Sequence, residues 1–129
     1  MDITPLIPKG VNYINGYTEN ALRINDKLVS TDVIITPNLL QEWNNNDGIF
    51  AQNSYEQFFE FAAEHKIQNI ILLIGVGKTY IKPDISFVKL FAKHGIMPEV
   101  MNTASACKTY NVLVSEQRLV CAMLSCNIK

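Results

Sequence analysis

The sequence predicts one α/β domain over residues 1–129, built as three layers with three helices and a mixed, mostly parallel sheet that carries an N-terminal antiparallel hairpin. Three observations predict this fold class. The 129 residues are 48% hydrophobic with a formal net charge of -1, which suits one buried core and excludes a disordered chain. From residue 54 onward, apolar strand patterns alternate with amphipathic helical patterns, the order typical of an α/β sheet. The first third is instead made of short β-type segments.

The N-terminal third predicts an antiparallel hairpin. Residues 11–17 form a candidate strand broken at Gly16, and residues 21–24 and 27–29 form two more. The last two flank Asn25-Asp26, which tolerate the left-handed backbone conformation of a tight turn. We therefore expect the chain to reverse direction there.

The next two elements are a strand and a helix. Residues 32–36 are apolar and β-branched, and Pro37 ends the strand because proline cannot donate to a ladder. Ser54 and Gln57 have the spacing of a capping box, which predicts a helix from there to about residue 66. The residues expected on its buried side are Phe58, Phe61, Ala62 and His65.

Two further strand–helix units and a closing strand complete the pattern. Residues 70–74 are apolar at every position, as in a strand covered on both faces. Asp84 is expected to cap the next helix and Gly95 to end it. The residues expected on the inner face of that helix are Ile85, Val88, Phe91 and Ala92.

The last unit runs from a strand at residues 96–101 to a strand at residues 119–125. Thr103 is expected to cap the helix between them. Its inward residues are predicted to be Ala106, Tyr110, Leu113 and Val114. The two middle crossovers are expected to be right-handed and to join parallel strands.

Residues 72–79 end like a nucleotide-binding loop, but the rest of the pattern fails. Leu72 replaces the first glycine of a P-loop, and Pro83 interrupts the region where its helix should run. Tyr80 replaces the third glycine of a dinucleotide fingerprint. We therefore expect no nucleotide cofactor, and the glycines serve to turn the chain off a buried strand.

The thiols and imidazoles indicate neither a metal centre nor a nucleophile. The two histidines and three cysteines have no metal-binding spacing, and an odd cysteine count without a secretion signal favours free thiols. Cys107 lies near a predicted helix start, but His65 and His94 are expected at the opposite edge of the sheet. A buried, inert Cys107 is therefore favoured. Trp43 is either an exposed interaction anchor or, as is commoner, a half-buried residue.

One candidate site survives these exclusions. Ligands of open α/β sheets bind beyond the carboxyl ends of parallel strands, and two such ends are expected to be neighbours here. The second end begins a helix, whose amides and dipole favour an anion. We predict a shallow cleft for an anion or an acidic peptide segment, with a solvent-filled notch as the alternative. Its residues are Gly75, Gly77, Lys78, Asn102, Thr103, Ser105, Cys107 and Lys108.

The same two segments resemble a known family. The resemblance is carried by LLIGVGK at residues 72–78 and EVMNTASACKTYNVL at residues 99–113. Further matches stand at residues 14–17, Pro83, Gly95 and Ile96. The pattern is similar to the small α/β domain family of mitochondrial complex I assembly factor 3 and related uncharacterised bacterial proteins. The resemblance implies a three-layer α/β fold, no established catalytic activity and, for the mitochondrial members, a role in assembling respiratory complex I.

Two positions depart from the family pattern. Asn102 stands where the family often carries Asp, and Lys108 stands where it often carries Arg. Asn102 removes a negative charge from the predicted cleft, and Lys108 keeps a positive charge without the planar bidentate fork of arginine. Any role that depends on those two family side chains is not expected here.

The residues and the resemblance together favour a non-enzymatic protein-interaction or assembly factor with a protein partner. The alternative is a small-anion- or metabolite-binding protein, or a weak enzyme, that uses residues 75–78 and 103–108. The near-neutral charge argues against nucleic-acid binding. The longest apolar run, residues 70–74, is too short for a membrane helix. Without a visible signal or transit peptide, a cytoplasmic location is expected.

Overall fold

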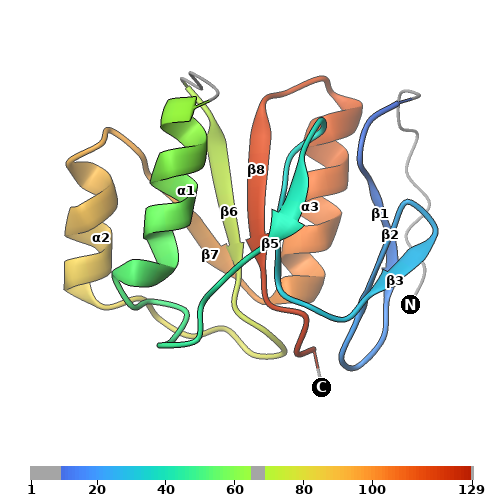
Figure 1. Cartoon of the computed structure of the whole chain (residues 1–129), viewed down its shortest axis with the longest axis horizontal. Helices are drawn as coiled ribbons and strands as arrows, with labels where there is room; N and C mark the ends of the chain where they lie inside the picture. The colour runs from blue at the N-terminus through green and yellow to red at the C-terminus, as the bar shows by residue number, and fades with distance from the viewer. Residues whose placement is uncertain (1–9, 65–68, 129) are drawn as a thin grey trace.

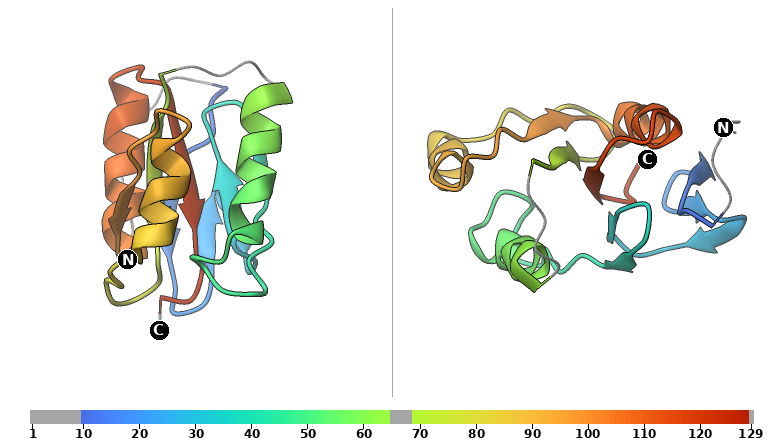
Figure 2. Two further views of the ribbon diagram at one scale, coloured as in Figure 1. Left: turned by 90° about the vertical axis from the view of Figure 1, so that its left-hand side faces the viewer. Right: turned by 90° about the horizontal axis from the view of Figure 1, so that it is seen from above.

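Within residues 10–64 and 69–128, the computed structural model of the chain has the predicted α/β class (Figure 1). The strands are β1 (Ile14–Tyr17), β2 (Leu22–Ile24), β3 (Lys27–Val29), β4 (Val33–Ile35), β5 (Leu40–Glu42), β6 (Ile71–Gly75), β7 (Glu99–Met101) and β8 (Val120–Leu124). The helices are α1 (Asn53–Glu64), α2 (Ile85–Ala92) and α3 (Thr103–Ser115). Figure 2 shows α1 and α3 on opposite sides of the sheet, with α2 at one end of the molecule.

The central sheet has five strands in the order β5-β4-β8-β6-β7. β6 is parallel to both β7 and β8, whereas β4 is antiparallel to β8 and to β5. The hairpin turn is confirmed, with φ of 52° at Asn25 and 65° at Asp26. The expectation that the hairpin makes this sheet mixed is wrong, because β1, β2 and β3 form a separate antiparallel sheet. The antiparallel pairings of the central sheet are instead made by β4, with β8 on one side and β5 on the other.

Two edge strands of the central sheet differ from the sequence pattern. β5 is not predicted, because its three residues show no apolar alternation in the sequence. In the structure all three are exposed. β7 begins at Glu99, so residues 96–98 of the predicted strand lie in the loop that leads from α2. That loop lies beside α2 and lines a groove together with it.

The sheet is buried on both faces because successive side chains of β6 and β8 alternate between two apolar clusters. One cluster joins the sheet to α3 and the small sheet, and it includes Leu73 and Ala122. The other lies against α1 and α2, and it includes Leu72 and Met123. The prediction of a strand covered on both faces is therefore confirmed for β6.

A side chain on α3 holds the small sheet in place. Asn111 is buried, accepts a hydrogen bond from the Ile14 N–H at 3.0 Å and donates through Nδ2 to the Ile14 carbonyl at 2.5 Å. The Asn111 amide thus makes the two hydrogen bonds with the Ile14 backbone that a neighbouring strand would otherwise make. The Tyr110 hydroxyl donates to the Asn12 carbonyl at 3.0 Å. These contacts attach β1 to a helix rather than to the central sheet.

The inner face of α2 differs from the prediction. Phe87 and Phe91 are buried, whereas Ile85 is 72% exposed and Val88 is 48% exposed. Ala92 is exposed as well, so only Phe91 of the predicted set lies inward. The larger rings take the inner face because they pack against Tyr55, with centroids 4.9 Å away for Phe87 and 5.0 Å for Phe91.

The start of α1 also differs from the predicted capping box. The helix begins at Asn53, and the Ser54 hydroxyl donates to the Gly48 carbonyl at 2.6 Å instead of capping. Gln57 donates to the Glu42 carbonyl at 2.5 Å, so both side chains hold the preceding loop. The buried positions predicted at residues 58 and 61 are confirmed. Residue 65 lies outside the described residues.

Trp43 is neither exposed nor half-buried. It is 2% exposed, and its indole N–H donates to the Ser54 carbonyl at 2.8 Å. Its ring lies 6.4 Å from that of Tyr55, centroid to centroid. Both interpretations offered by the sequence are therefore wrong, and Trp43 is part of the core beneath α1.

Replacing Tyr55 by phenylalanine is expected to leave stability unchanged or to raise it by up to about 1 kcal/mol. The Tyr55 hydroxyl is buried and has no hydrogen-bond partner among the described residues. Removing it ends an uncompensated desolvation cost, while the ring contacts with Phe87 and Phe91 persist. Urea unfolding of the wild-type and Y55F proteins measures the difference. A loss of more than about 1 kcal/mol would reveal a hydrogen bond that the structure does not show.

Candidate functional site

The two predicted strand ends lie side by side. The Thr103 N–H donates to the Gly77 carbonyl at 2.8 Å, and the Gly77 N–H donates to Thr103 Oγ1 at 2.8 Å. The loop after β6 and the start of α3 are thus joined by reciprocal hydrogen bonds. The parallel pairing of β6 and β7 brings about this arrangement, because the carboxyl ends of both strands reach one edge of the sheet.

Thr103 also ties this edge to β8. It is fully buried, and its hydroxyl donates to the Ser125 carbonyl at 2.9 Å while it accepts from the Gly77 N–H. The Ser125 N–H in turn donates to the Gly75 carbonyl at 2.9 Å. Thr103 therefore joins the ends of β6 and β8 to the first turn of α3.

Glycine is needed at positions 75 and 77 because other segments of the chain pack closely against the backbone there. A Cβ at Gly75 would lie 3.0 Å from the Thr103 Cα and 3.0 Å from Leu124 Cδ2. Gly77 has φ of +105°, and a Cβ there would lie 3.0 Å from the Asn127 carbonyl oxygen. The backbone of the loop is therefore packed directly against α3 and the C-terminal segment.

The cap of α3 is Asn102 and not Thr103 as predicted. The Asn102 side chain accepts from the Ser105 N–H at 2.8 Å, and its carbonyl accepts from the Ala106 N–H at 3.0 Å. The amides of Thr103 and Ser105 thus already have acceptors within the protein. An anion at this helix start would compete with the Asn102 side chain for the Ser105 N–H.

The remaining cleft residues divide into exposed and buried ones. Lys78, Ser105 and Lys108 are exposed. Cys107 is 0% exposed and lies in the core cluster with α3, and burial raises its thiol pKa to about 12. The structure therefore offers two lysines near the strand ends but turns Cys107 away from them, into the interior. A neutral thiol with a raised pKa is a poor nucleophile.

The three cysteines are free, and burial raises the pKa of each. For Cys126, which is half-buried, the pKa rises to about 11. Within the described part of the chain, no three His, Cys, Asp or Glu side chains are placed to hold a metal ion. None of the helices in that part has the length and apolar character needed to cross a membrane.

Stability is expected to fall at alkaline pH. Below about pH 9, Cys107 is protonated in the folded and the unfolded chain, so the benefit of burying a neutral thiol is fully present. Between about pH 9 and 12 only the unfolded chain releases the Cys107 proton, and this group alone lowers the free energy of unfolding by about 1.4 kcal/mol per pH unit. The other two cysteines, whose pKa is also raised, add to the slope. Urea midpoints at several pH values measure this slope. The Cys107→Ala variant should show a shallower slope, and an unchanged slope would contradict the assignment.

The fold and the strand-end geometry together define the class of protein. A five-stranded mixed sheet carries α1 and α2 on one face, and α3 with a small antiparallel sheet on the other. A solved Bordetella pertussis protein, described as a Mth938-like domain, has a TM-score of 0.70 and 18% identity over 98% of this chain and 93% of that one. A Bordetella parapertussis crystal structure has a TM-score of 0.75 and 24% identity over 92% and 98% of the two chains. The chain therefore has the Mth938-like α/β fold.

Sequence comparison shows the family. The chain belongs to the family of proteins of unknown function DUF498/DUF598, whose model matches residues 14–125. It is 32% identical over 114 residues to NADH dehydrogenase [ubiquinone] 1 alpha subcomplex assembly factor 3 of Xenopus tropicalis, covering 87% of this chain. The match covers 60% of that relative, so the chain spans about three-fifths of its length. The family resemblance carried by residues 72–78 and 99–113 is confirmed.

Proposed function

We propose that this chain is a non-enzymatic assembly factor that docks on a protein partner, and that its role is linked to the assembly of respiratory complex I. The observation that carries the proposal is the 32% identity, over 87% of the chain, to a protein named as a complex I assembly factor. A docking role also fits the molecule physically. Among the described residues, large exposed apolar side chains lie on α2 and the loop after it, with Ile85 72% exposed and Met97 89% exposed.

The geometry supports docking better than small-molecule chemistry at the strand ends. The Gly77 N–H and the Thr103 hydroxyl are engaged with each other, and the Ser105 N–H is engaged with Asn102. The alternative of an anion or metabolite site at residues 75–78 and 103–108 depends on the exposed Lys78 and Lys108. Two exposed lysines beside amides that already have acceptors, those of Gly77, Thr103 and Ser105, make a weaker site than a cradle of unpaired N–H groups. We further propose a cytoplasmic location, which the free cysteines support.

Capture of the tagged protein from its native cells tests this proposal. Quantitative mass spectrometry is expected to find respiratory-complex subunits enriched over a capture with the tag alone. The enrichment should fall when excess untagged protein is added, because specific sites saturate. Enrichment of no protein over the tag control would contradict a docking role. Enrichment of partners unrelated to respiratory complexes would keep docking and remove the link to complex I.

A further inference from the structure

The outer side of α2 carries an apolar stripe beside a basic one. Successive residues of a helix are rotated by about 100°, which places Val88, Ala92 and Ile85 within roughly 60° of one another. Lys89 and Lys93 continue around the helix from that stripe by the same geometry. These residues are exposed, whereas Phe87 and Phe91, which follow around the helix on the other side of Val88, are buried. An apolar stripe that the sequence assigns to the core therefore faces solvent.

The stripe borders an apolar groove. The groove has a volume of about 290 Å³, and its walls include Pro83, Val88, Ala92, Ile96, Met97 and Pro98. Met97 is 89% exposed, the most exposed of the large apolar side chains in the described residues. On the other side of α2, a second hollow of about 300 Å³ is lined by Lys89, Lys93 and Leu90 among others. The helix thus stands between an apolar groove and a hollow edged by lysines.

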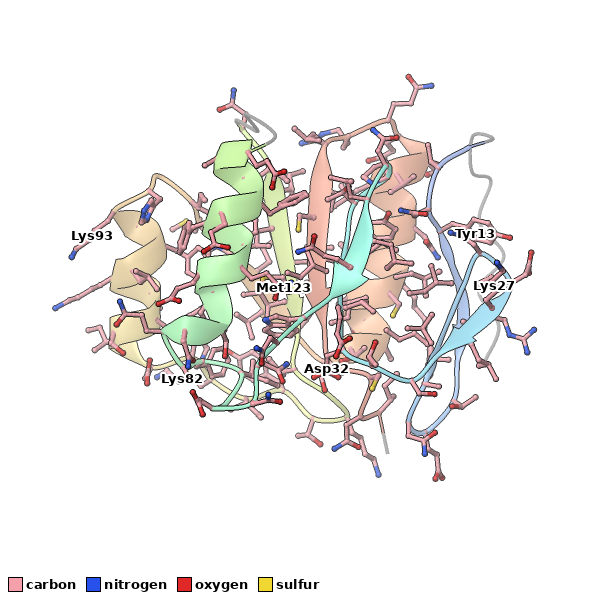
Figure 3. The ribbon with its side chains drawn as sticks, in the orientation of Figure 1. Tyr13, Lys27, Asp32, Lys82, Lys93 and Met123 are labelled. Atoms are coloured by element: carbon pink, nitrogen blue, oxygen red, sulfur yellow. The ribbon has the colours of Figure 1, made fainter. Side chains whose placement is uncertain are left out.

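The chain segment that contains α2 and the walls of the groove has a net positive charge, although the whole protein does not. Residues 78–98 contain four lysines against one aspartate, a formal charge of +3, whereas the rest of the chain carries seven basic and eleven acidic residues, or −4. The aspartate, Asp84, is occupied in capping α2, because its side chain accepts from the Phe87 N–H at 3.1 Å. All four lysines are exposed. Figure 3 shows Lys93 on the outer side of α2, at the opposite end of the molecule from Lys27.

We propose that this α2 surface, defined as Ile85, Val88, Lys89, Ala92, Lys93 and Met97, binds an acidic amphipathic helix of a protein partner. An apolar side chain of the partner helix enters the groove, and carboxylates on its flanks pair with Lys89 and Lys93. The inference rests on the proposed docking function and identifies the chemistry of the partner.

Two features of the molecule favour this occupant over others. A second copy docked through the same surface would place Lys89 and Lys93 of each molecule close to those of the other, which like-charge repulsion opposes. An added strand would have to pair with β7, which is three residues long and carries the exposed acid Glu99 at its start. An acidic helix on α2 would pair with Lys89 and Lys93 and would not need the edge of β7.

Titration with a defined peptide pair tests the charge and the place of binding. The probe is a synthetic 15-residue helix with leucines at three- and four-residue spacing and glutamates elsewhere, and the control has lysines in place of the glutamates. Amide chemical shifts of residues 83–98 are expected to change with the acidic peptide only. The double variant Lys89→Glu, Lys93→Glu should weaken binding by about tenfold or more. The control double variant Lys27→Glu, Lys108→Glu carries the same charge change elsewhere and should bind like the wild type.

Photo-crosslinking in native cells separates this inference from the proposed function. A crosslinking amino acid at position 88 is compared with one at position 112, where Val112 is 55% exposed on α3. The expected adduct forms from position 88, and its partner peptide maps to an acidic amphipathic helix. Adducts from position 112 alone, adducts with a second copy or a lipid, or a non-acidic partner peptide would overturn the α2 surface and leave docking intact. No protein adduct from any position, together with an empty capture, would overturn both.

Discussion

Replacing Asn111 by leucine is expected to lower the free energy of unfolding by about 3 kcal/mol. The Asn111 amide is buried and holds both the N–H and the carbonyl of Ile14, a residue 97 positions earlier in the chain. Leucine fills a similar volume but leaves both backbone groups buried without a partner, and each costs about 1–3 kcal/mol. Against a typical stability of about 5–15 kcal/mol, this is a large loss. Urea unfolding at pH 7 measures it.

Two controls define what the Asn111 result means. Val112 is adjacent on α3 and 55% exposed, so Val112→Ala should change stability by less than about 1 kcal/mol. Hydrogen exchange at the Ile14 amide should become faster in N111L, because that N–H loses its acceptor. If N111L unfolds like the wild type and protects the Ile14 amide equally, Asn111 does not fasten the small sheet.

Replacing Thr103 by valine is expected to lower the free energy of unfolding by about 2–4 kcal/mol. The two side chains have nearly the same shape, so the packing of Thr103 is retained. What valine lacks is the hydroxyl that accepts from the Gly77 N–H and donates to the Ser125 carbonyl. Both backbone groups then lose their partner at the edge where β6, β8 and α3 meet. Thermal and urea unfolding of the purified variant measure the effect.

The matched variant for this site is Thr103→Ser, which keeps the hydroxyl and removes one methyl group. It should recover a large part of the stability lost in T103V and retain only the cost of a small cavity, about 1 kcal/mol. Equal losses in the two variants would assign the role of Thr103 to packing. In that case the loop after β6 would be held by the Thr103 N–H bond to the Gly77 carbonyl alone.

The parts of the fold that the sequence predicts are those with a strong local signal. Asn25 and Asp26 predict the hairpin because few residues tolerate positive φ, and residues 70–74 predict a buried strand because every position is apolar. No local signal of this kind shows which side of α2 is buried. Ile85, Val88 and Ala92 form one apolar stripe and Phe87 and Phe91 another, and the packing of the two rings on Tyr55 and other aromatic side chains decides between them. Both stripes have helical spacing, so periodicity cannot separate them.

The candidate site is predictable to a similar extent. Parallel strands place Gly77 and Thr103 at the same edge, and their hydrogen bonds confirm the neighbourhood. The chemistry of the edge depends on contacts that sequence spacing does not reveal. The Thr103 hydroxyl reaches Ser125, which is 22 residues away, and the cap shifts by one residue to Asn102. A predicted anion cradle is therefore built from groups that are already bonded to one another.

We propose that the molecule docks on its partner through α2 rather than through the strand ends. Capture from native cells with two uncharged double variants tests it most directly. Ile85→Gln, Val88→Gln changes the apolar stripe, and Lys78→Gln, Lys108→Gln changes the strand-end lysines, all at exposed positions that should leave the melting temperature close to that of the wild type. We expect the first variant to lose at least about tenfold of the captured partner and the second to retain it. Retention of the partner by the first variant and its loss by the second would show that docking uses the strand ends and not α2.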